Sequence, residues 1–401
     1  MKRVPPEVCA RCKGYRRLCG ARRCPILERV RSFYSAGWDS RRPEGPTPPS
    51  PLVGEAGYPK VPVSLGISPY GDPTVRDSPE LWARGGFDLE AVAKLRMEMI
   101  FPFKKFDARR PEELLKGDLL WGAVSERPVD AEAKALGRPL PPSLDGILAP
   151  VGASVRAEEI KVIDNPKVDP LLERRSSEGL KAEEAVKELF RKGRSIYLIQ
   201  KAFSVGMFGV KKRLVPTRWA ITAVDVAVAK AIKEDMKGLP WVGGPKVGVY
   251  SHYGNVYKVL LVPGPPIVEM VEVWEPRSLW TPKEVTIYNY EGPTARSKAL
   301  DPDDGGFHAL KVGVLKALKE RGVSATALVI RRVTPDYYLP LGAWQVREGS
   351  YMATLKALDS GDMSLKEALE RLQDEKVVMF KSLRQRSLSE YTLPAARRPR
   401  T

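Results

Sequence analysis

All four cysteines of the chain lie close together near its N-terminus, in the pattern C-x2-C-x6-C-x4-C. They are Cys9, Cys12, Cys19 and Cys24. A C-x2-C pair places two thiolates on one side of a tight turn, and a second pair within reach completes a tetrahedral set of zinc ligands. We therefore expect a structural zinc ion here. Four sulfur ligands would close its coordination shell, so we do not expect this metal to be catalytic.

Two other interpretations of the cysteines remain open, namely a pair of disulfides and a redox-active C-x2-C pair. Cytosolic disulfides are rare outside hyperthermophiles, and a redox motif would leave the second pair unexplained. The segment has almost no apolar side chains to form a core, so it needs another source of stability, such as a bound zinc ion, to fold. Its basic residues favour phosphate contact, although a merely solvated basic surface fits as well. They are Arg11, Lys13, Arg16, Arg17, Arg22 and Arg23.

The segment 201–225 combines glycines, basic residues and the start of an expected helix. Gly206 and Gly209 would let the backbone approach a ligand closely, and Pro216 is typical of a helix start. A helix N-terminus beside arginine suits a phosphate group, and a solvated basic face suits the same pattern equally well. The candidate phosphate- or nucleic-acid-binding residues are Lys211, Lys212, Arg213, Thr217, Arg218, Arg331 and Arg347.

Standard catalytic signatures are missing from the sequence. There is no G-x-x-x-x-G-K-[ST] loop and no H-E-x-x-H helix, and neither of the two histidines falls in a known motif. Carboxylates such as Asp225, Glu272 and Asp336 can hold Mg²⁺ or Mn²⁺ for phosphoryl chemistry, but their spacing does not demand it. Whether the protein is an enzyme therefore stays open. The candidate catalytic residues are Lys201, Arg218, Asp225 and Glu272.

The C-terminal segment carries a short peptide that can form one turn of tight helix. Such a turn places Leu388 and Tyr391 on the same side, as a plug for an apolar pocket, with Gln385 at the rim. A terminus can reach a partner, so we expect this peptide to bind one, with an inert tail as the alternative.

The formal net charge is +17, and its uneven placement favours an anionic partner such as DNA, RNA or a membrane surface. A soluble protein that is merely basic is the alternative. Residues 1–50 hold 12 Lys and Arg against 4 Asp and Glu, and residues 381–401 hold 6 against 1. No apolar run is long enough to span a bilayer, and the N-terminus lacks the core of a signal peptide. We therefore expect a cytoplasmic protein. Its few asparagines and glutamines indicate a thermophile.

Hydrophobic periodicity predicts a mixed α/β or α+β body. We expect helices at 26–34, 87–99, 171–191, 216–237, 305–321, 344–358 and 365–380. Strands are expected at 195–200, 267–274, 285–290 and 325–333, with a hairpin at 246–263. Proline-rich stretches at 41–51 and 137–150 read as an extended linker and a loop.

From these patterns we expect the chain to divide into four parts. Residues 1–34 form a small four-cysteine zinc module, and 35–194 form an N-terminal region with a proline-rich linker. Residues 195–380 form the α/β core with a phosphate or nucleic-acid cleft. Residues 381–401 form a flexible basic tail with the partner-binding peptide.

The segments together resemble the archaeal Nre family of DNA-repair proteins, of the NreA type. Matching blocks run through most of the chain in family order. They include Leu18-Cys19-Gly20, Gly57-Tyr58-Pro59, Asp77-Ser78-Pro79-Glu80, Ser204-Val205-Gly206, Leu214-Val215-Pro216-Thr217-Arg218-Trp219, Glu272-Val273-Trp274, and Pro340-Leu341-Gly342 with Trp344 and Val346-Arg347-Glu348.

The resemblance implies a DNA-binding factor that acts in the response to DNA damage. It also implies zinc at the four cysteines and a C-terminal peptide that docks on the sliding clamp (PCNA) through Gln385, Leu388 and Tyr391. The tail departs from the family pattern at Thr392, where a second aromatic residue is common, and this should weaken clamp binding. Two alternatives stand beside this expectation: a metal-dependent phosphoesterase, nuclease or nucleotide-processing enzyme, and an RNA-processing zinc protein.

Overall fold

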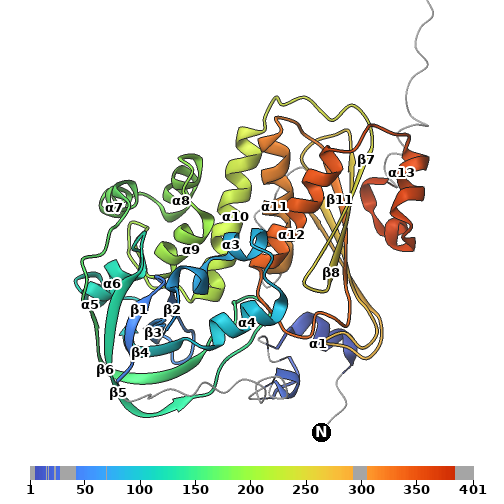
Figure 1. Cartoon of the computed structure of the whole chain (residues 1–401). Coiled ribbons are helices and arrows are strands. Elements are labelled where there is room, and N and C mark those ends of the chain that lie inside the picture. The colour runs from blue at the N-terminus through green and yellow to red at the C-terminus, as the bar shows by residue number, and fades with distance from the viewer. Residues whose placement is uncertain are drawn as a thin grey trace, which may run out of the picture.

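The computed structural model describes residues 5–14, 16, 18–21, 24–27, 42–68, 70–291 and 305–383. It is a mixed α+β structure, as the sequence predicted. One β-sheet comes from the N-terminal half and another from the C-terminal half, with helices α8, α9 and α10 between them (Figure 1). Among the described helices, none combines the length and apolar character needed to cross a bilayer.

The first sheet has six strands in the order β1-β5-β6-β4-β3-β2. Neighbours are antiparallel except for the parallel pair β4 and β6. Burial alternates along the first half of β5, because one face of the sheet packs on the core. The strands are β1 Glu44–Thr47, β2 Pro51–Val53, β3 Lys60–Leu65, β4 Ile100–Asp107, β5 Val129–Leu140 and β6 Ala153–Val162.

This sheet corrects the expected linker at 41–51 and the expected loop at 137–150. The first contains β1 and the start of β2, and the second begins inside β5. Both β1 and β2 are edge strands of the sheet. An edge strand has backbone N–H groups that pair with no neighbour, so Pro46 and Pro51 are tolerated there. Proline content was therefore misleading in this region.

Short helices connect the strands of the first half. The predicted helix at 87–99 is confirmed as α4, which begins where Asp88 accepts a hydrogen bond from the Ala91 N–H (2.7 Å). The expected single helix at 171–191 is instead two helices, α7 and α8. The helical elements are η1 Pro73–Asp77, α3 Pro79–Arg84, α4 Leu89–Met97, α5 Glu112–Leu115, α6 Asp118–Ala123, α7 Pro170–Ser177 and α8 Ala182–Arg191.

The expected strand at 195–200 is wrong, because this segment starts helix α9 (Ile196–Ser204). The Ser195 side chain caps the helix by accepting a hydrogen bond from the Tyr197 N–H. The segment is rich in strand-forming residues, but α9 packs against the long helix α10 (Thr217–Asp235). Burial against a neighbouring helix here outweighs a weak local preference for strand.

The second sheet has five strands in the order β10-β9-β11-β8-β7. Strand β11 pairs antiparallel with β8 and parallel with β9, and every residue of β9 is buried. The predicted hairpin, the three other predicted strands and the helices at 216–237, 305–321 and 344–358 are confirmed. The elements are β7 Lys246–His252, β8 Asn255–Val262, β9 Val268–Trp274, β10 Val285–Glu291, α11 Gly305–Glu320, β11 Thr326–Val333 and α12 Trp344–Leu358.

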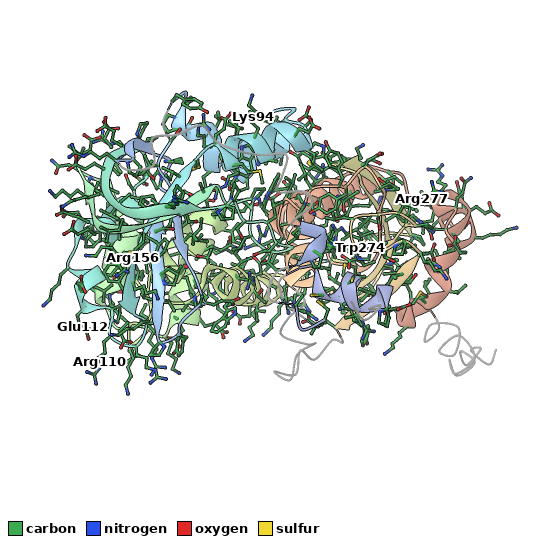
Figure 2. The ribbon with its side chains drawn as sticks, turned by 90° about the horizontal axis from the view of Figure 1, so that it is seen from below. Lys94, Arg110, Glu112, Arg156, Trp274 and Arg277 are labelled. Atoms are coloured by element: carbon green, nitrogen blue, oxygen red, sulfur yellow. The ribbon has the colours of Figure 1, made fainter. Side chains whose placement is uncertain are left out.

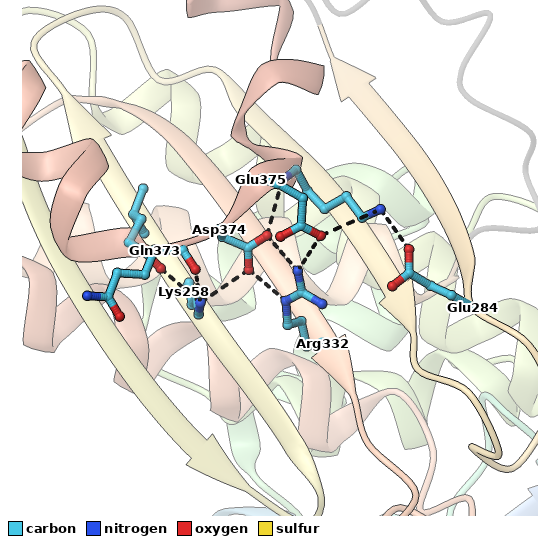
Figure 3. Close-up of polar contacts among 8 residues, drawn as sticks. Lys258, Glu284, Arg332, Gln373, Asp374 and Glu375 are labelled. Atoms are coloured by element: carbon cyan, nitrogen blue, oxygen red, sulfur yellow. Dashed lines mark hydrogen bonds and ion pairs between the residues drawn. The ribbon is translucent and has the colours of Figure 1, made fainter.

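Helices cover both faces of the second sheet, with α11 and α12 on one side and the C-terminal helical segment on the other (Figure 1). The expected helix at 365–380 is only partly right, because α13 (Leu365–Leu372) ends and η2 (Glu375–Met379) follows. Between them, the buried Asp374 carboxylate accepts hydrogen bonds from Arg332 Nε (2.6 Å) and Nη2 (2.7 Å) on β11 (Figure 3). This ion pair holds the interruption of the helix against the sheet.

Candidate functional site

The cysteine segment begins with helix α1 (Pro6–Cys12). Cys9 and Cys12 lie on this helix, and all four cysteines are free thiols. Burial raises the pKa of Cys9, and the thiols of Cys24, Cys12 and Cys19 raise it further, so each of these three sulfurs lies within electrostatic reach of Cys9. The donor set therefore suits zinc. The described residues nevertheless contain no group of three or more His, Cys, Asp or Glu arranged to hold a metal ion.

Lys13 fastens the cysteine segment to the second sheet. Its Nζ lies 3.0 Å from an oxygen of the buried Glu272 on β9 and 5.6 Å from the ring centre of Trp274, which Figure 2 shows beside α1. Arg331 pairs with the same carboxylate, and its Nε donates to Asn255 Oδ1 (3.0 Å). Glu272 and Arg331 therefore have internal partners, and they anchor the cysteine segment instead of lining a cleft.

A cavity of about 810 Å³ lies between the cysteine segment and the start of α10. We call it the outer cavity. Its size falls in the range of small-molecule and nucleotide sites, about 300–1,000 Å³. It is lined by Arg16, Leu18, Glu55, Ile147, Ala182, Glu183, Phe203, Arg218, Trp219, Thr222, Ala223, Val226, Ala227 and His308. Most of these side chains are apolar, and a few polar groups converge on them.

Two adjacent residues of the first turn of α10 give the outer cavity its polar and aromatic sides. Arg218 forms ion pairs with Asp145 (2.8 Å) and Glu55. Trp219 is 52 % exposed, which is unusual for so large an apolar side chain. His308 of α11 is buried, and its Nδ1 has no hydrogen-bond partner among the described residues. Burial lowers the pKa of His308 to about 4, so its ring is neutral at neutral pH.

A smaller cavity of about 90 Å³ lies between the first sheet, the start of α10 and the start of α12. We call it the inner cavity. The residues that line it are Ser50, Pro51, Leu52, Asp77, Pro79, Arg96, Ile147, Leu148, Ala149, Val151, Tyr197, Gln200, Lys201, Thr217, Ile221, Trp344 and Arg347. The two cavities share Ile147, and the consecutive residues Thr217 and Arg218 contribute to one each.

The four candidate catalytic residues do not form one site. Lys201 lines the inner cavity, where its Nζ pairs with an Asp77 oxygen at 2.9 Å, whereas Arg218 lines the outer cavity. Asp225 of α10 is fully buried and accepts two hydrogen bonds from Arg347 Nη2 (2.7 and 2.8 Å). Glu272 belongs to the anchor of the cysteine segment. Asp225 and Lys201 therefore lie near the inner cavity, and the other two lie elsewhere.

The predicted phosphate-binding residues also separate. Lys211 and Arg213 are exposed on the loop after α9. Lys212 donates instead to the carbonyl oxygen (2.6 Å) and hydroxyl (2.7 Å) of Ser176. The Thr217 hydroxyl accepts a hydrogen bond from a backbone N–H of β2 (2.8 Å). Gln385, Leu388 and Tyr391 lie outside the described residues, as does most of the predicted helix at 26–34.

The sequence reasoning missed Arg96 and Trp219 as cavity residues. A usable signal existed for Arg96, which follows the apolar Val92 and Ala93 at helical spacing in α4 and is equally buried there. A charged residue at a core position of an amphipathic helix needs a buried partner. No comparable local signal marks Trp219, because the exposure of a side chain depends on distant chain segments.

Comparison with known proteins shows which family models match the chain. The family model described as "Archaeal Nre, N-terminal" matches residues 18–281, and the one described as "Archaeal Nre, C-terminal" matches 291–395. Strands β7, β8 and β9 fall in the first match and β11 in the second. The second sheet is therefore built from both segments, which cannot be independent domains. No solved structure matches the chain significantly.

Relatives match over nearly the whole length. DNA repair protein NreA of Archaeoglobus fulgidus is 36 % identical over 96 % of this chain and 98 % of its own. DNA repair protein NreB of the same organism is 33 % identical over 85 % and 86 %. DNA repair protein NreA of Haloferax volcanii is 32 % identical over 83 % and 84 %. The extent of these matches and of the family models shows that the chain belongs to the archaeal Nre family.

Proposed function

We propose that this protein is a DNA-repair factor that binds DNA at the outer cavity and holds an unstacked base against Trp219. The role in repair rests on the relatives, which are named DNA repair proteins. The place of binding rests on one observation, the half-exposed tryptophan beside a large and mostly apolar cavity. Every base has an aromatic face, so a tryptophan at such a place binds single-stranded DNA without sequence preference.

The charges around the outer cavity support stacking as the main source of affinity there. Arg218 is paired with two carboxylates, so its charge is already largely balanced. Lys211 and Arg213, on the loop that begins at Gly209, are exposed. This loop starts near the cavity, because a Cβ built on Gly209 would contact the lining residue Ala182 at 3.8 Å. These two cations can follow the phosphate backbone and make affinity fall with salt.

Replacing Trp219 with alanine tests the proposal. Base stacking contributes about 1–3 kcal/mol per base, so affinity for a labelled single-stranded oligonucleotide should fall about tenfold to a hundredfold in fluorescence anisotropy. Trp241→Ala is the matched control, because Trp241 is 60 % exposed and lines neither cavity. Equal affinity of Trp219→Ala and the control variant would remove the outer cavity as the DNA site.

The proposal has two further parts. A structural zinc ion at Cys9, Cys12, Cys19 and Cys24 would fix the segment that forms one wall of the outer cavity. The neighbouring free thiols support this part. Docking of the C-terminal peptide on the sliding clamp rests on the family resemblance. Such tethering raises the local concentration of the protein at replication and repair sites without any new DNA contact.

A further inference from the structure

Two residues of helix α12 that line the inner cavity carry three hydrogen-bond donors without partners among the described residues. They are Nε and Nη1 of Arg347 and Nε1 of Trp344. Both side chains line this cavity, and they are only 3 % and 5 % exposed. Buried polar atoms almost always have a partner, and leaving one unpaired weakens the folded state. Three such atoms on two neighbouring turns of one helix therefore indicate a ligand.

The chemistry of these atoms restricts that ligand. Guanidinium and indole groups donate hydrogen bonds and cannot accept them. The ligand must therefore present acceptor oxygens, and a negative charge would strengthen each bond. Arg347 Nη2 is already held by Asp225 at 2.7 and 2.8 Å, and the guanidinium lies 5.2 Å from the centre of the Tyr197 ring. These contacts fix the plane of the guanidinium, while Nε and Nη1 have no hydrogen-bond partner among the described residues.

The opposite wall is also cationic and rigidly held. Arg96 donates from Nε to the Pro150 carbonyl (3.0 Å) and from Nη1 to the Ser50 hydroxyl (2.9 Å). Asp77 lies 3.0 Å from Arg96 Nη1 and 2.9 Å from Lys201 Nζ. An ammonium group has three donors, so Lys201 has donors left after its bond to Asp77. The lining of the cavity thus holds three cations, Arg96, Lys201 and Arg347, in fixed positions beside one carboxylate, Asp77.

Two long helices begin at this cavity and add to its positive potential. Thr217 is the first residue of α10 and Trp344 the first of α12, and both line it. The N-cap residues of these helices are Pro216 and Ala343, which have no side-chain oxygen to cap the first turn. The partial positive charge of a helix N-terminus favours an anion.

The volume of the inner cavity limits the size of the anion that it can hold. A nucleotide or drug-sized ligand needs about 300–1,000 Å³, whereas the inner cavity offers about 90 Å³. One water molecule occupies about 10–15 Å³ on this measure, so the space holds a few waters or one small oxyanion. We propose that the inner cavity binds a single phosphate group, held by Arg347, Trp344 and Lys201.

Two sources of this phosphate are compatible with the geometry. One is free inorganic phosphate. The other is the terminal phosphate of a DNA strand whose neighbouring nucleotide occupies the outer cavity, since the two cavities share Ile147. The second source rests on the function proposed above, whereas the phosphate site itself does not.

The test compares thermal unfolding of the full chain in increasing inorganic phosphate with unfolding in chloride at the same ionic strength. Phosphate should raise the unfolding midpoint in a saturable way. Trp344→Phe, which keeps the ring and removes the donor, and Lys201→Gln should each weaken phosphate binding about tenfold or more. Trp241→Phe is the matched control and should bind like the parent. The midpoints in chloride alone show whether each variant is folded.

Oligonucleotides with and without a 5′-phosphate separate the two sources. If the strand terminus is the ligand, the phosphorylated strand binds more tightly and free phosphate cancels the advantage. If free phosphate is the ligand, strand phosphorylation has no effect while the stabilisation persists. No phosphate effect beyond chloride would overturn the proposal, as would unchanged phosphate binding in both folded variants. Trp219→Ala should lose the oligonucleotide and keep phosphate, so the two proposals can fail separately.

Discussion

Glu272→Gln removes the charge that fastens the cysteine segment to the second sheet. The carboxylate is buried, pairs with Lys13 and Arg331, and accepts a hydrogen bond from Trp274 Nε1 (2.9 Å). Glutamine has nearly the same shape, so packing is preserved. The substitution leaves the buried Arg331 and the mostly buried Lys13 without their counter-charge, which is the costly way to break a buried ion pair.

The pKa of Glu272 sets the size of the effect. Burial raises this pKa, but Lys13, Arg331 and the bond from Trp274 outweigh burial and bring it from 4.5 to about 2. One pKa unit corresponds to about 1.4 kcal/mol, so the charged form contributes about 3 kcal/mol to stability at neutral pH. Removing one partner of a buried pair typically costs about 3–5 kcal/mol, which agrees.

The pH dependence follows from the direction of this shift. A lowered folded-state pKa stabilises the protein fully above the unfolded value of 4.5, and the contribution is lost as the pH falls towards 2. Urea unfolding of the parent and of Glu272→Gln should therefore differ by about 3 kcal/mol at neutral pH. The difference should shrink below pH 4.5. Glu284→Gln is a matched control, because Glu284 forms a surface pair with Lys376 that contributes about 0–1 kcal/mol.

A difference in unfolding free energy that stays constant between neutral pH and pH 3 would refute the reasoning. It would mean that Glu272 titrates normally in the folded protein and that lost packing explains the destabilisation. A difference no larger than that of the control would show that the ion pair contributes nothing to stability.

Three further predictions concern packing, zinc and the C-terminal peptide. A Cβ on Gly313 would lie 2.2 Å from a carbonyl oxygen of α12. Gly313→Ala should therefore lower the free energy of unfolding by about 1–3 kcal/mol. Gly361→Ala is the control and should leave it unchanged, because nothing lies within 4 Å of a Cβ at that position. Purified protein should contain about one zinc ion per chain by elemental analysis, and Cys12→Ser should lose it; a metal-free parent would contradict this. Leu388→Ala combined with Tyr391→Ala should abolish clamp pull-down, and full retention would remove the docking peptide.

Local pattern predicted the second half of the fold well. The hairpin β7–β8, the strands β9 to β11 and the helices α10 to α12 were each predicted from their own residues. The pairs β7–β8 and β9–β10 also join segments that are near in sequence, so there local preference and the final contacts agree. The cysteine pattern was also visible in the sequence alone, because the spacing of four thiols can be recognised without a structure.

Tertiary structure alone decided the first sheet, helix α9 and the inner cavity. The strands β1 and β2 contain prolines, which an edge strand tolerates, and edge position depends on distant partners. The inner cavity needs Arg96, Lys201 and Arg347, which lie on three different helices. Sequence spacing cannot show that such charges converge, because the free energy that holds them together comes from contacts between segments far apart in the chain.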